Sequence, residues 1–490
     1  MRVIFKTITF LFLIQTSMIH LAFAGSGMGG HYLVGPQPGT DFTTLADALN
    51  QVEIHGIGDH VQLEMTPGTH FAHVEINPIT RTGNPNARLI ITSEDENDIA
   101  TLTHTPSSAT DNWIIKINQA EMIDIVSLGF KVEGSLNFTT AVMFDSGGND
   151  ITMVNNIFTS HPVNSTTTIP QEDASLISQV NDTHIDGLYI IDNEFDSGGA
   201  VLYLESADID GLQNIVIEDN LMENQTIRFG PKLIYMIRSR DVSIQRNEIS
   251  NQSPSGQGIT LASTNNLIFR QNSIFFSADG YSLALRVQSQ NTSDTTTNTL
   301  ISNNFIQATQ YGLDLSGLNK NVSVLNNTVL LSGTLLGNSA ISACLKSNNS
   351  EVSEVAMRGN ILINLTNGDN TRVLSVSNSN MFAESDYNIM FDSDGDSFFL
   401  DSTLYNTLGD YQSATGLDSS SLFQNVDFVD PVVGDLHLTS TMLEDPSLLI
   451  PANPDVIRDF DGFTRATNIH RAGADDAILP DLIFASGFED

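Results

Sequence analysis

The sequence predicts an all-β fold, a β-solenoid of stacked coils, from three observations. A phrase in which an Asn separates two β-type runs recurs at Asn156, Asn193, Asn220, Asn247, Asn272, Asn304, Asn327, Asn360 and Asn388. Successive phrases lie 23 to 37 residues apart without helical periodicity, which is typical of a β-solenoid. The 490 residues include one cysteine and 40% hydrophobic residues, and a solenoid buries a continuous core that needs no disulfides.

Residues 1–24 are expected to be a signal peptide. Arg2 and Lys6 form a positive start, an apolar stretch follows, and Ala22-Phe23-Ala24 supplies a small–x–small cleavage pattern. The alternative is a membrane anchor, but Thr16, Ser17 and His20 interrupt an apolar run already shorter than the ~18–20 residues needed to span a bilayer. The mature chain is therefore expected to be exported, with no transmembrane segment.

The mature chain is expected to begin with a short flexible segment, residues 25–30, and a helix over 41–52. In the helix, Phe42, Leu45, Ala48, Leu49 and Val52 recur at helical spacing. Asp41 is available as its N-cap. One helix ahead of a solenoid is expected to cap the open end of the core.

The Asn phrases, over about residues 140–395, are expected to mark corners between strands. Asn tolerates the left-handed backbone conformation that a sharp corner requires. Because coils stack, the Asn side chains are expected to lie above one another and to form a ladder of amide hydrogen bonds.

The charge balance excludes a nucleic-acid partner. The chain has 58 Asp+Glu against 20 Lys+Arg, a formal net charge of −38, so it lacks the basic surface that phosphate binding requires. Tight binding of polyanions is also disfavoured unless a divalent cation mediates it. The single Cys344 excludes intrachain disulfides and Cys-based zinc sites, and we expect it to be a structural residue.

Four segments of the N-terminal part carry a resemblance to a known family: HYLVGPQPGTDFTTLADAL, GIGDHVQLEMTPGTHFAHVEI, RLIITSEDENDIATLTH and NWIIKINQAEMIDIVSLGF. With them, residues 31–477 resemble right-handed parallel β-helix proteins of the pectin-lyase-like superfamily. The closing stretch, residues 459–477, is similar to the D-x-D-G-x-x-R…G-A-D-E end of such domains, with Asp476 in place of Glu. The nearest likeness is to exported bacterial members, adhesin-like or uncharacterised. The tail, residues 478–490, resembles short termini of other exported proteins.

The resemblance indicates the fold rather than an activity. The ordered N-T-D, D-D, G-H-G and R-I-K motifs of polygalacturonase-like members do not occur, and no close match to the calcium carboxylates of pectate-lyase-like members occurs either. These differences disfavour an enzyme, although a divergent active site stays open.

A candidate ligand site follows from aligning the strands before each Asn phrase, since outward side chains of successive coils then lie roughly 4.8 Å apart. The alignment brings Glu205, Arg238, Arg286 and Asp314 into one patch, and Asp145 and Tyr203 lie in the same columns. Guanidiniums beside carboxylates are suited to a carboxylated or hydroxyl-rich sugar. The alternative is an ordinary Glu205–Arg238 ion pair, which contributes ~0–1 kcal/mol.

The candidate metal site is the acidic loop that contains Asp392, Asp394, Asp396 and Asp401. Alternating carboxylates in a turn can converge on Ca²⁺, although the spacing is not that of an EF-hand. The alternative is an acidic loop without metal. The early histidines, His55, His60, His70, His73 and His104, are expected to be turn residues rather than ligands.

The sequence therefore predicts an exported β-helix protein that binds extracellular polysaccharide or a cell surface without catalysis. The alternative is a polysaccharide lyase or glycoside hydrolase that acts on a carboxylated polysaccharide. A purely structural surface protein stays open as well.

Overall fold

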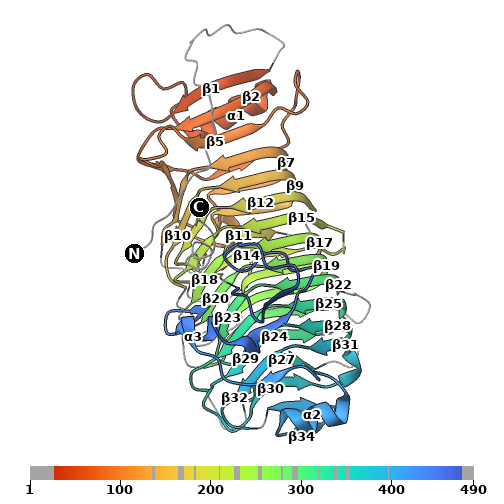
Figure 1. Ribbon diagram of the computed structural model, residues 1–490. Helices are drawn as coiled ribbons and strands as arrows, with labels where there is room; N and C mark the ends of the chain where they lie inside the picture. The colour runs from red at the N-terminus through yellow and green to blue at the C-terminus, as the bar shows by residue number, and fades with distance from the viewer. Residues whose placement is uncertain are drawn as a thin grey trace, which may run out of the picture.

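The computed structural model is a right-handed parallel β-helix. It describes residues 27–476 except residues 135–137, 164–169, 181–183, 209, 226–231, 252–255, 277–279, 290–295, 318, 336–339, 349–351 and 396. The predicted signal peptide and C-terminal tail lie outside the described residues. Figure 1 shows the coils stacked in chain order, with a C-terminal segment that returns across the middle coils.

Each coil contributes strands to three faces. The described residues form a 22-stranded sheet and a 13-stranded sheet, with almost all pairs parallel. Four long strands of the larger sheet pass from the first face to the second: β7 (Ile115–Val126), β9 (Val142–Val154), β17 (Lys232–Gln245) and β19 (Gln257–Arg270). The sheet bends within these strands, at residues with positive φ such as Gln119 and Arg238.

The first face contains the strand that opens each coil. Besides the first parts of the four long strands, it consists of β4 (Val74–Ile76), β11 (Ser175–Val180), β14 (Ala200–Glu205), β21 (Leu283–Gln288), β24 (Tyr311–Ser316), β27 (Ser342–Ser347), β30 (Thr371–Val376), β33 (Phe398–Leu400) and the antiparallel β34 (Thr403–Tyr405).

The second face contains the strand that precedes each ladder Asn. Besides the second parts of the long strands, it consists of β1 (Met28–Val34), β2 (Ile57–Met65), β5 (Leu89–Ser93), β12 (Ile185–Ile191), β15 (Leu212–Glu218), β22 (Thr296–Ser302), β25 (Asn319–Leu325), β28 (Ser353–Arg358) and β31 (Phe382–Asp386). Because β1 begins at Met28, the domain starts within the predicted flexible segment.

The third face is the 13-stranded sheet. It consists of β3 (Thr69–Phe71), β6 (Thr101–His104), β8 (Gly129–Val132), β10 (Ile157–Ser160), β13 (Glu194–Asp196), β16 (Leu221–Glu223), β18 (Glu248–Asn251), β20 (Ser273–Phe276), β23 (Phe305–Ala308), β26 (Thr328–Leu331), β29 (Ile361–Asn364), β32 (Ile389–Asp392) and β35 (Leu422–Phe423). Two short 3₁₀ turns, η1 (Ala109–Asp111) and η2 (Ser379–Met381), lie at corners.

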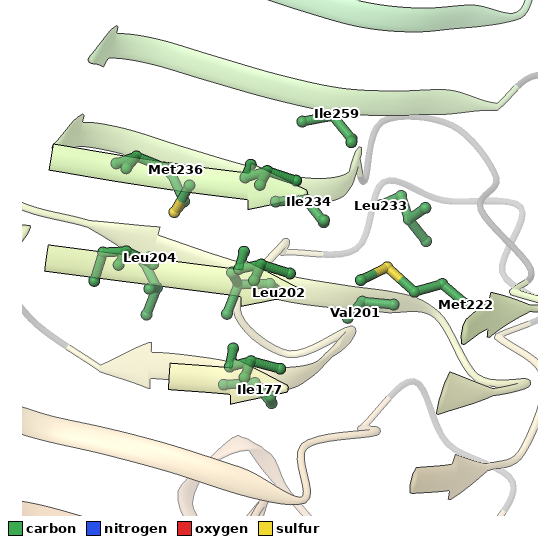
Figure 2. Close-up of a cluster of buried hydrophobic side chains, with 14 of the residues drawn as sticks. Ile177, Val201, Leu202, Leu204, Met222, Leu233, Ile234, Met236 and Ile259 are labelled. Carbon is green, nitrogen blue, oxygen red and sulfur yellow. The ribbon is translucent and has the colours of Figure 1, made fainter. Parts of the chain in front are cut away.

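The core is a stack of aliphatic side chains inside the coils. Ile177, Leu202, Ile234 and Ile259 lie in register in β11, β14, β17 and β19, and all are buried (Figure 2). Each fully buried aliphatic side chain contributes about 1.5–3 kcal/mol relative to an exposed one. This burial holds the coils together without a disulfide, and the single Cys344 is also buried, as expected.

The predicted Asn ladder is confirmed. The amide Nδ2 of Asn247 donates to Asn272 Oδ1 at 3.0 Å, and every predicted Asn from Asn156 to Asn360 makes the same bond to the next coil, at 2.8–3.1 Å. Asn388 ends the row by donating to Asp418 at 2.9 Å. The prediction that the ladder Asn itself has the left-handed conformation is wrong. The positive φ lies at the residue before it, for example Asp192 or Arg246.

A helix lies at the N-terminal end, where one was predicted. The α1 helix (Leu45–His55) buries Leu45, Ala48, Leu49 and Val52 in the main core. Its N-cap is Thr44, which accepts a hydrogen bond from the Asp47 N–H, and not Asp41. Asp41 instead accepts a bond from the Leu33 N–H at 2.8 Å.

The C-terminal segment covers the outer side of the third face. After α2 (Leu408–Thr415) it contains β36 (Phe428–Asp430), β37 (Asp435–Leu438), α3 (Ser440–Leu443), η3 (Pro446–Leu448), β38 (Leu449–Pro451) and β39 (Ile469–Arg471). Its Leu436, Leu448 and Ile450 pack on Phe305 and Ile361 in a second apolar cluster.

The closing motif holds this segment in place. The buried Arg465 guanidinium donates to the carbonyls of Gly473 and Ala474 at 2.8 Å and to Asn303 Oδ1 at 2.9 Å. Asp459 accepts a bond from the Phe463 N–H at 2.8 Å. The D-x-D-G-x-x-R stretch therefore has a structural role in this chain.

Candidate functional site

The first face carries two outward columns of side chains, which the strand register defines. The first column contains Lys232, Gln257, Leu283, Tyr311, Ala343 and Arg372. The second column contains Glu75, Lys116, Met143, Ser178, Tyr203, Tyr235, Thr260, Arg286, Asp314, Lys346, Ser375 and Phe399. All six predicted ligand-binding residues lie on this face or at its edge.

Among the strands that carry the predicted ligand residues, the predicted alignment of the columns is wrong in two, β17 and β21. In β17 it is displaced by one residue, because Tyr235 faces outward while Met236 lies in the core. Arg238 therefore lies one residue beyond the outward position of β17, at the bend of the strand, where its φ is +59°. In β21 the displacement is two residues, because Leu285 and Val287 point inward, so Arg286 stands beside Thr260.

Arg286 and Asp314 form a charge pair on this face, in which two guanidinium nitrogens approach one carboxylate oxygen. Asp314 Oδ2 accepts from Arg286 Nε at 3.0 Å, with Nη2 at 2.9 Å, and Lys346 Nζ lies at 3.5 Å. The hydroxyl of Ser316 also donates to this carboxylate, which is only 1% exposed. A carboxylate enclosed in this way has its oxygens occupied by donors of its own chain.

Glu205 and Arg238 lie beside each other, four and three strands away from Asp314. Tyr203 donates its hydroxyl hydrogen to Glu205 Oε2 at 2.6 Å, and burial followed by this interaction raises the pKa of Tyr203. Arg238 Nη1 lies 3.9 Å from Glu205 Oε1 and donates to the Ser206 carbonyl at 2.7 Å. The four charged residues of the predicted patch therefore form two separate pairs, with Thr260 of β19 between them.

The carboxylates of the face are widely spaced along the axis. Glu205 and Asp314 are four coils apart, or about 19 Å at the usual strand spacing. Asp145 and Glu205 are two coils apart, or about 10 Å, and Asp145 lies 3.7 Å from Lys116 Nζ. Glycosidase carboxylates are about 5–10 Å apart, so only the second pair approaches that geometry.

Cation–π pairs are a feature of this face that the sequence reasoning missed. Lys116 lies 4.7 Å from the Trp113 ring centroid and Lys232 4.2 Å from that of Tyr235. The remaining pairs on the face are Lys346 over Tyr311 at 4.1 Å and Arg372 over Phe399 at 4.2 Å. Among the described residues these are four of five such pairs. The spacing Trp113-x-x-Lys116 and Lys232-x-x-Tyr235 was the available signal.

Asp173 is a second feature that the sequence did not indicate. It lies just before β11, beside the strand that carries Tyr203, and burial together with the neighbouring Glu172 raises its pKa to about 6. The Glu172 carboxylate also contributes to the raised pKa of Tyr203. Acidic groups thus gather around Tyr203, at the N-terminal half of the face.

The acidic loop is only partly described, because Asp396 lies outside the described residues. Asp392 accepts hydrogen bonds from Thr371 and from the Asp394 N–H, at 2.8 and 3.1 Å. Asp401 accepts from the backbone and hydroxyl of Ser379. Within the described parts of the chain, no three His, Cys, Asp or Glu side chains are arranged to hold a metal ion. The calcium site stays a prediction.

Two of the early histidines take part in a ring stack at the N-terminal end. The His73 ring lies 4.4 Å from that of His104 and 4.6 Å from that of Trp113. Burial, followed by the charge of His104, lowers the pKa of His73. This stack adjoins Lys116 and so extends the aromatic part of the first face.

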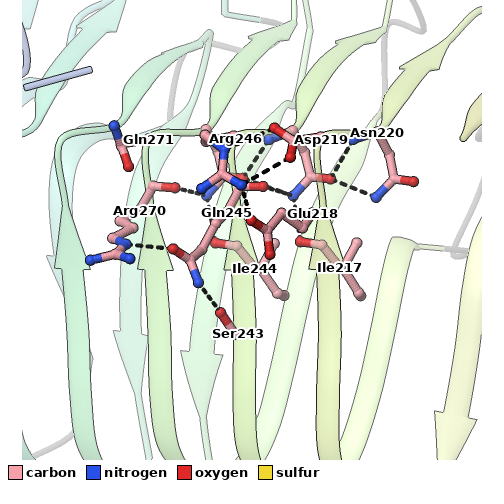
Figure 3. A network of polar contacts seen from close by, with 12 residues as sticks. Ile217, Glu218, Asp219, Asn220, Ser243, Ile244, Gln245, Arg246, Arg270 and Gln271 are labelled. Carbon is pink, nitrogen blue, oxygen red and sulfur yellow. Dashed lines mark hydrogen bonds and ion pairs between the residues drawn. The ribbon is translucent and has the colours of Figure 1, made fainter. Parts of the chain in front are cut away.

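The second face carries a polar network of a different kind at its end near the Asn ladder. Figure 3 shows Arg246 between Glu218 and Asp219, and Arg270 against Gln245. Arg246 Nε lies 2.8 Å from Asp219 Oδ1, and both side chains are about 40% exposed. Such exposed pairs contribute little to stability.

Comparisons with known proteins identify the fold. Residues 175–355 match the family described as right handed beta helix region. No curated protein sequence matches the chain. None of the helices in the described residues is long and apolar enough to cross a membrane.

Solved structures that match this chain share little sequence with it. A complex of XylC with xylose has a TM-score of 0.53 at 10% identity, and the match covers 92% of this chain and 98% of that one. A mannuronic acid specific polysaccharide family 6 lyase from human gut microbiota has a TM-score of 0.38 at 14% identity, with coverage of 82% and 92%. The pectin methylesterase from Aspergillus niger has a TM-score of 0.28 at 14% identity, with coverage of 66% and 86%.

Proposed function

We propose that this right-handed parallel β-helix protein is exported and binds a carboxylate-bearing extracellular polysaccharide along its first face, without turning it over. The observation that carries the proposal is the repetition of cation–π pairs from Trp113–Lys116 to Arg372–Phe399 along one face. Rings offer an apolar surface to the C–H groups of a sugar, and the cations beside them attract a carboxylate.

The local charge supports an acidic ligand despite the acidic composition of the whole chain. The two columns of the first face contain five cations, Lys116, Lys232, Arg286, Lys346 and Arg372, against two carboxylates, Glu75 and Asp314. Charges fixed at intervals of whole coils along a rod match a polymer whose carboxylates also repeat along its length.

Binding rather than catalysis is supported by the state of the carboxylates. Asp314 is enclosed by Arg286, Lys346 and Ser316, and it is about 19 Å from Glu205 along the axis. An acid and a base that act on one glycosidic bond need a much shorter separation.

The test is calorimetric titration of the chain from residue 25 onward with an oligogalacturonate. Lys232→Met and Lys346→Met keep the apolar stem but remove the charge, so each is expected to weaken binding about fivefold, from about 1 kcal/mol per pair. Arg358→Met is the matched control, because Arg358 makes the one described cation–π pair that lies off the first face. Absence of oligogalacturonate binding, or equal losses in the control, would refute the proposal.

A hydrolase or lyase that acts on the same polymer is the second candidate. Asp145 and Glu205 lie about 10 Å apart along the axis, near the upper limit for inverting glycosidases. The pKa of Asp173, about 6, suits a proton donor at mildly acidic pH. If the titrated samples gain reducing ends or unsaturated uronate products, and Glu205→Gln abolishes that gain, the chain is an enzyme and the proposal of binding without catalysis is wrong.

A further inference from the structure

The second face contains an open groove that none of the features above involves. Its volume is about 590 Å³, and it lies over the second part of β17 and β19 and over β22 and β25. Ser243, Ile268, Leu300 and Ser323 stand in register and form its floor. Asp455, from the C-terminal segment, contributes to its lining.

One rim of the groove is a second, exposed ladder of amides. Asn321 Nδ2 donates to Asn298 Oδ1 at 2.7 Å, Asn298 to Asn266 at 2.9 Å, and Asn266 to Asp241 at 2.8 Å. All four residues have positive φ, so their side chains project from the same bend in successive coils. Each ladder bond uses one N–H of an amide, so the second N–H of each exposed amide faces solvent.

The floor between the rims is apolar at its centre. Ile268 is 39% exposed, and Leu300 is half-buried beside it in the next coil. A strip of apolar surface next to a row of amides matches a sugar ring, which presents C–H groups on its face and hydroxyls at its edge.

The charge of the lining distinguishes this groove from the first face. Asp241 and Asp455 are its charged residues, and no Lys or Arg among the described residues lines it. An anionic polymer would meet two carboxylates in this lining, and Arg240, which does not line the groove, is held 3.3 Å from Asp241 Oδ2. A neutral chain rich in hydroxyl groups would meet amide donors and carboxylate acceptors.

We propose that this groove is a binding site for a neutral, hydroxyl-rich oligosaccharide that lies along the coil axis. The amides of Asn266, Asn298 and Asn321 bind its hydroxyls at one position per coil. Ile268 and Leu300 contact its C–H faces. The site is separate from the first face and does not depend on the function proposed for that face.

The test uses xylohexaose, cellohexaose and maltohexaose as neutral probes, each titrated into the full chain from residue 25 onward. At least one is expected to bind. Leu300→Glu places a third carboxylate on the floor and is expected to weaken that binding by at least about tenfold. Val216→Glu is the matched control, because Val216 stands in the same column one coil outside the groove; it is expected to leave binding unchanged.

Oligogalacturonate provides the second readout. Its binding is expected to be the same in Leu300→Glu and in the unaltered chain, so failure of this proposal and failure of the first-face proposal give different results. If no neutral probe binds, or if Val216→Glu weakens binding as much as Leu300→Glu, the proposal is wrong. If the probes bind only a chain that ends at Asp476, residues 477–490 occupy the groove instead, which also overturns it. Thermal melts verify that each variant is folded.

Discussion

The replacement of one ladder residue, Asn247→Ala, tests how the coils are held in register. Asn247 is 1% exposed, and its amide makes bonds in both directions along the axis. Its Oδ1 accepts from the backbone and side-chain nitrogens of Asn220 at 3.1 and 2.9 Å. Its Nδ2 donates to the Ile217 carbonyl at 2.9 Å and to Asn272 Oδ1 at 3.0 Å.

Alanine leaves several buried polar groups without partners. Two N–H groups of Asn220 lose their acceptor and the Ile217 carbonyl loses its donor, each at a cost of about 1–3 kcal/mol. Because neighbouring coils can relax or admit a water molecule, we expect a total loss of about 3–5 kcal/mol in the free energy of unfolding. The loss exceeds that of one ordinary hydrogen bond, because the buried partners are left behind.

The assay is guanidinium denaturation, combined with hydrogen exchange of the peptide that contains Asn220. The exchange measurement is needed because long repeat proteins can unfold in parts. The control is Asn298→Gly in the exposed ladder, where water replaces the lost bonds and glycine accepts the positive φ; we expect a change below about 1 kcal/mol. A loss below about 1 kcal/mol for Asn247→Ala, with unchanged protection at Asn220, would refute the reasoning.

Three further predictions concern the C-terminal half. Burial opposes protonation of His437, but hydrogen bonds to Asp461 and Asp435 outweigh it and raise its pKa to about 9. The protonated His437 ring therefore stabilises the folded chain fully below pH 6.5, and this contribution is lost as pH rises through about 9. His437→Gln is expected to flatten that part of a plot of melting temperature against pH. Arg465→Lys cannot reach the same set of carbonyls, so limited proteolysis is expected to cut the C-terminal segment of this variant first; equal resistance would contradict this. If the acidic loop binds Ca²⁺, adding the ion raises the melting temperature and Asp394→Ala abolishes the rise, whereas an unchanged curve removes the hypothesis.

The repeating elements of the fold were predictable from the sequence, because one residue per coil is constrained by contacts to the coils on both sides. Every ladder Asn lies where predicted, since only a short amide can join three coils at that corner. The adjoining left-handed residue varies among Asp, Arg, Gln, Asn, Tyr and Gly, so no single residue type marked it.

The first-face columns were less predictable, because the corner that precedes this face varies in length. Leu202 follows its ladder residue Asn193 by 9 residues, whereas the equivalent Ile234 follows Asn220 by 14. Counting residues from the ladder Asn therefore does not locate the inward and outward positions of β17 correctly, and the same holds for β21. The ion pairs and cation–π pairs depend on that register, so they became visible only in the structure.

The covered part of the third face left a signal in the sequence. The outward residues of β13 are Glu194 and Asp196, whereas those of β29 are Ile361 and Ile363. The change from acidic to aliphatic residues occurs where the C-terminal segment packs against the sheet. Alternation within single short strands is easily overlooked, but its change along the series predicts that something covers the later coils.

The ladder also makes the coil a unit that can be inserted or removed. Residues 220–246 form one full turn, from one ladder Asn to the residue before the next. Their excision would join Asp219 to Asn247 and keep a left-handed residue ahead of a ladder Asn, so the remaining turns are able to close the gap by moving one strand spacing. The length of this rod, and with it the number of Lys–aromatic positions on the first face, can therefore change by whole-coil duplication or deletion during evolution, without any change to the packing of the other coils.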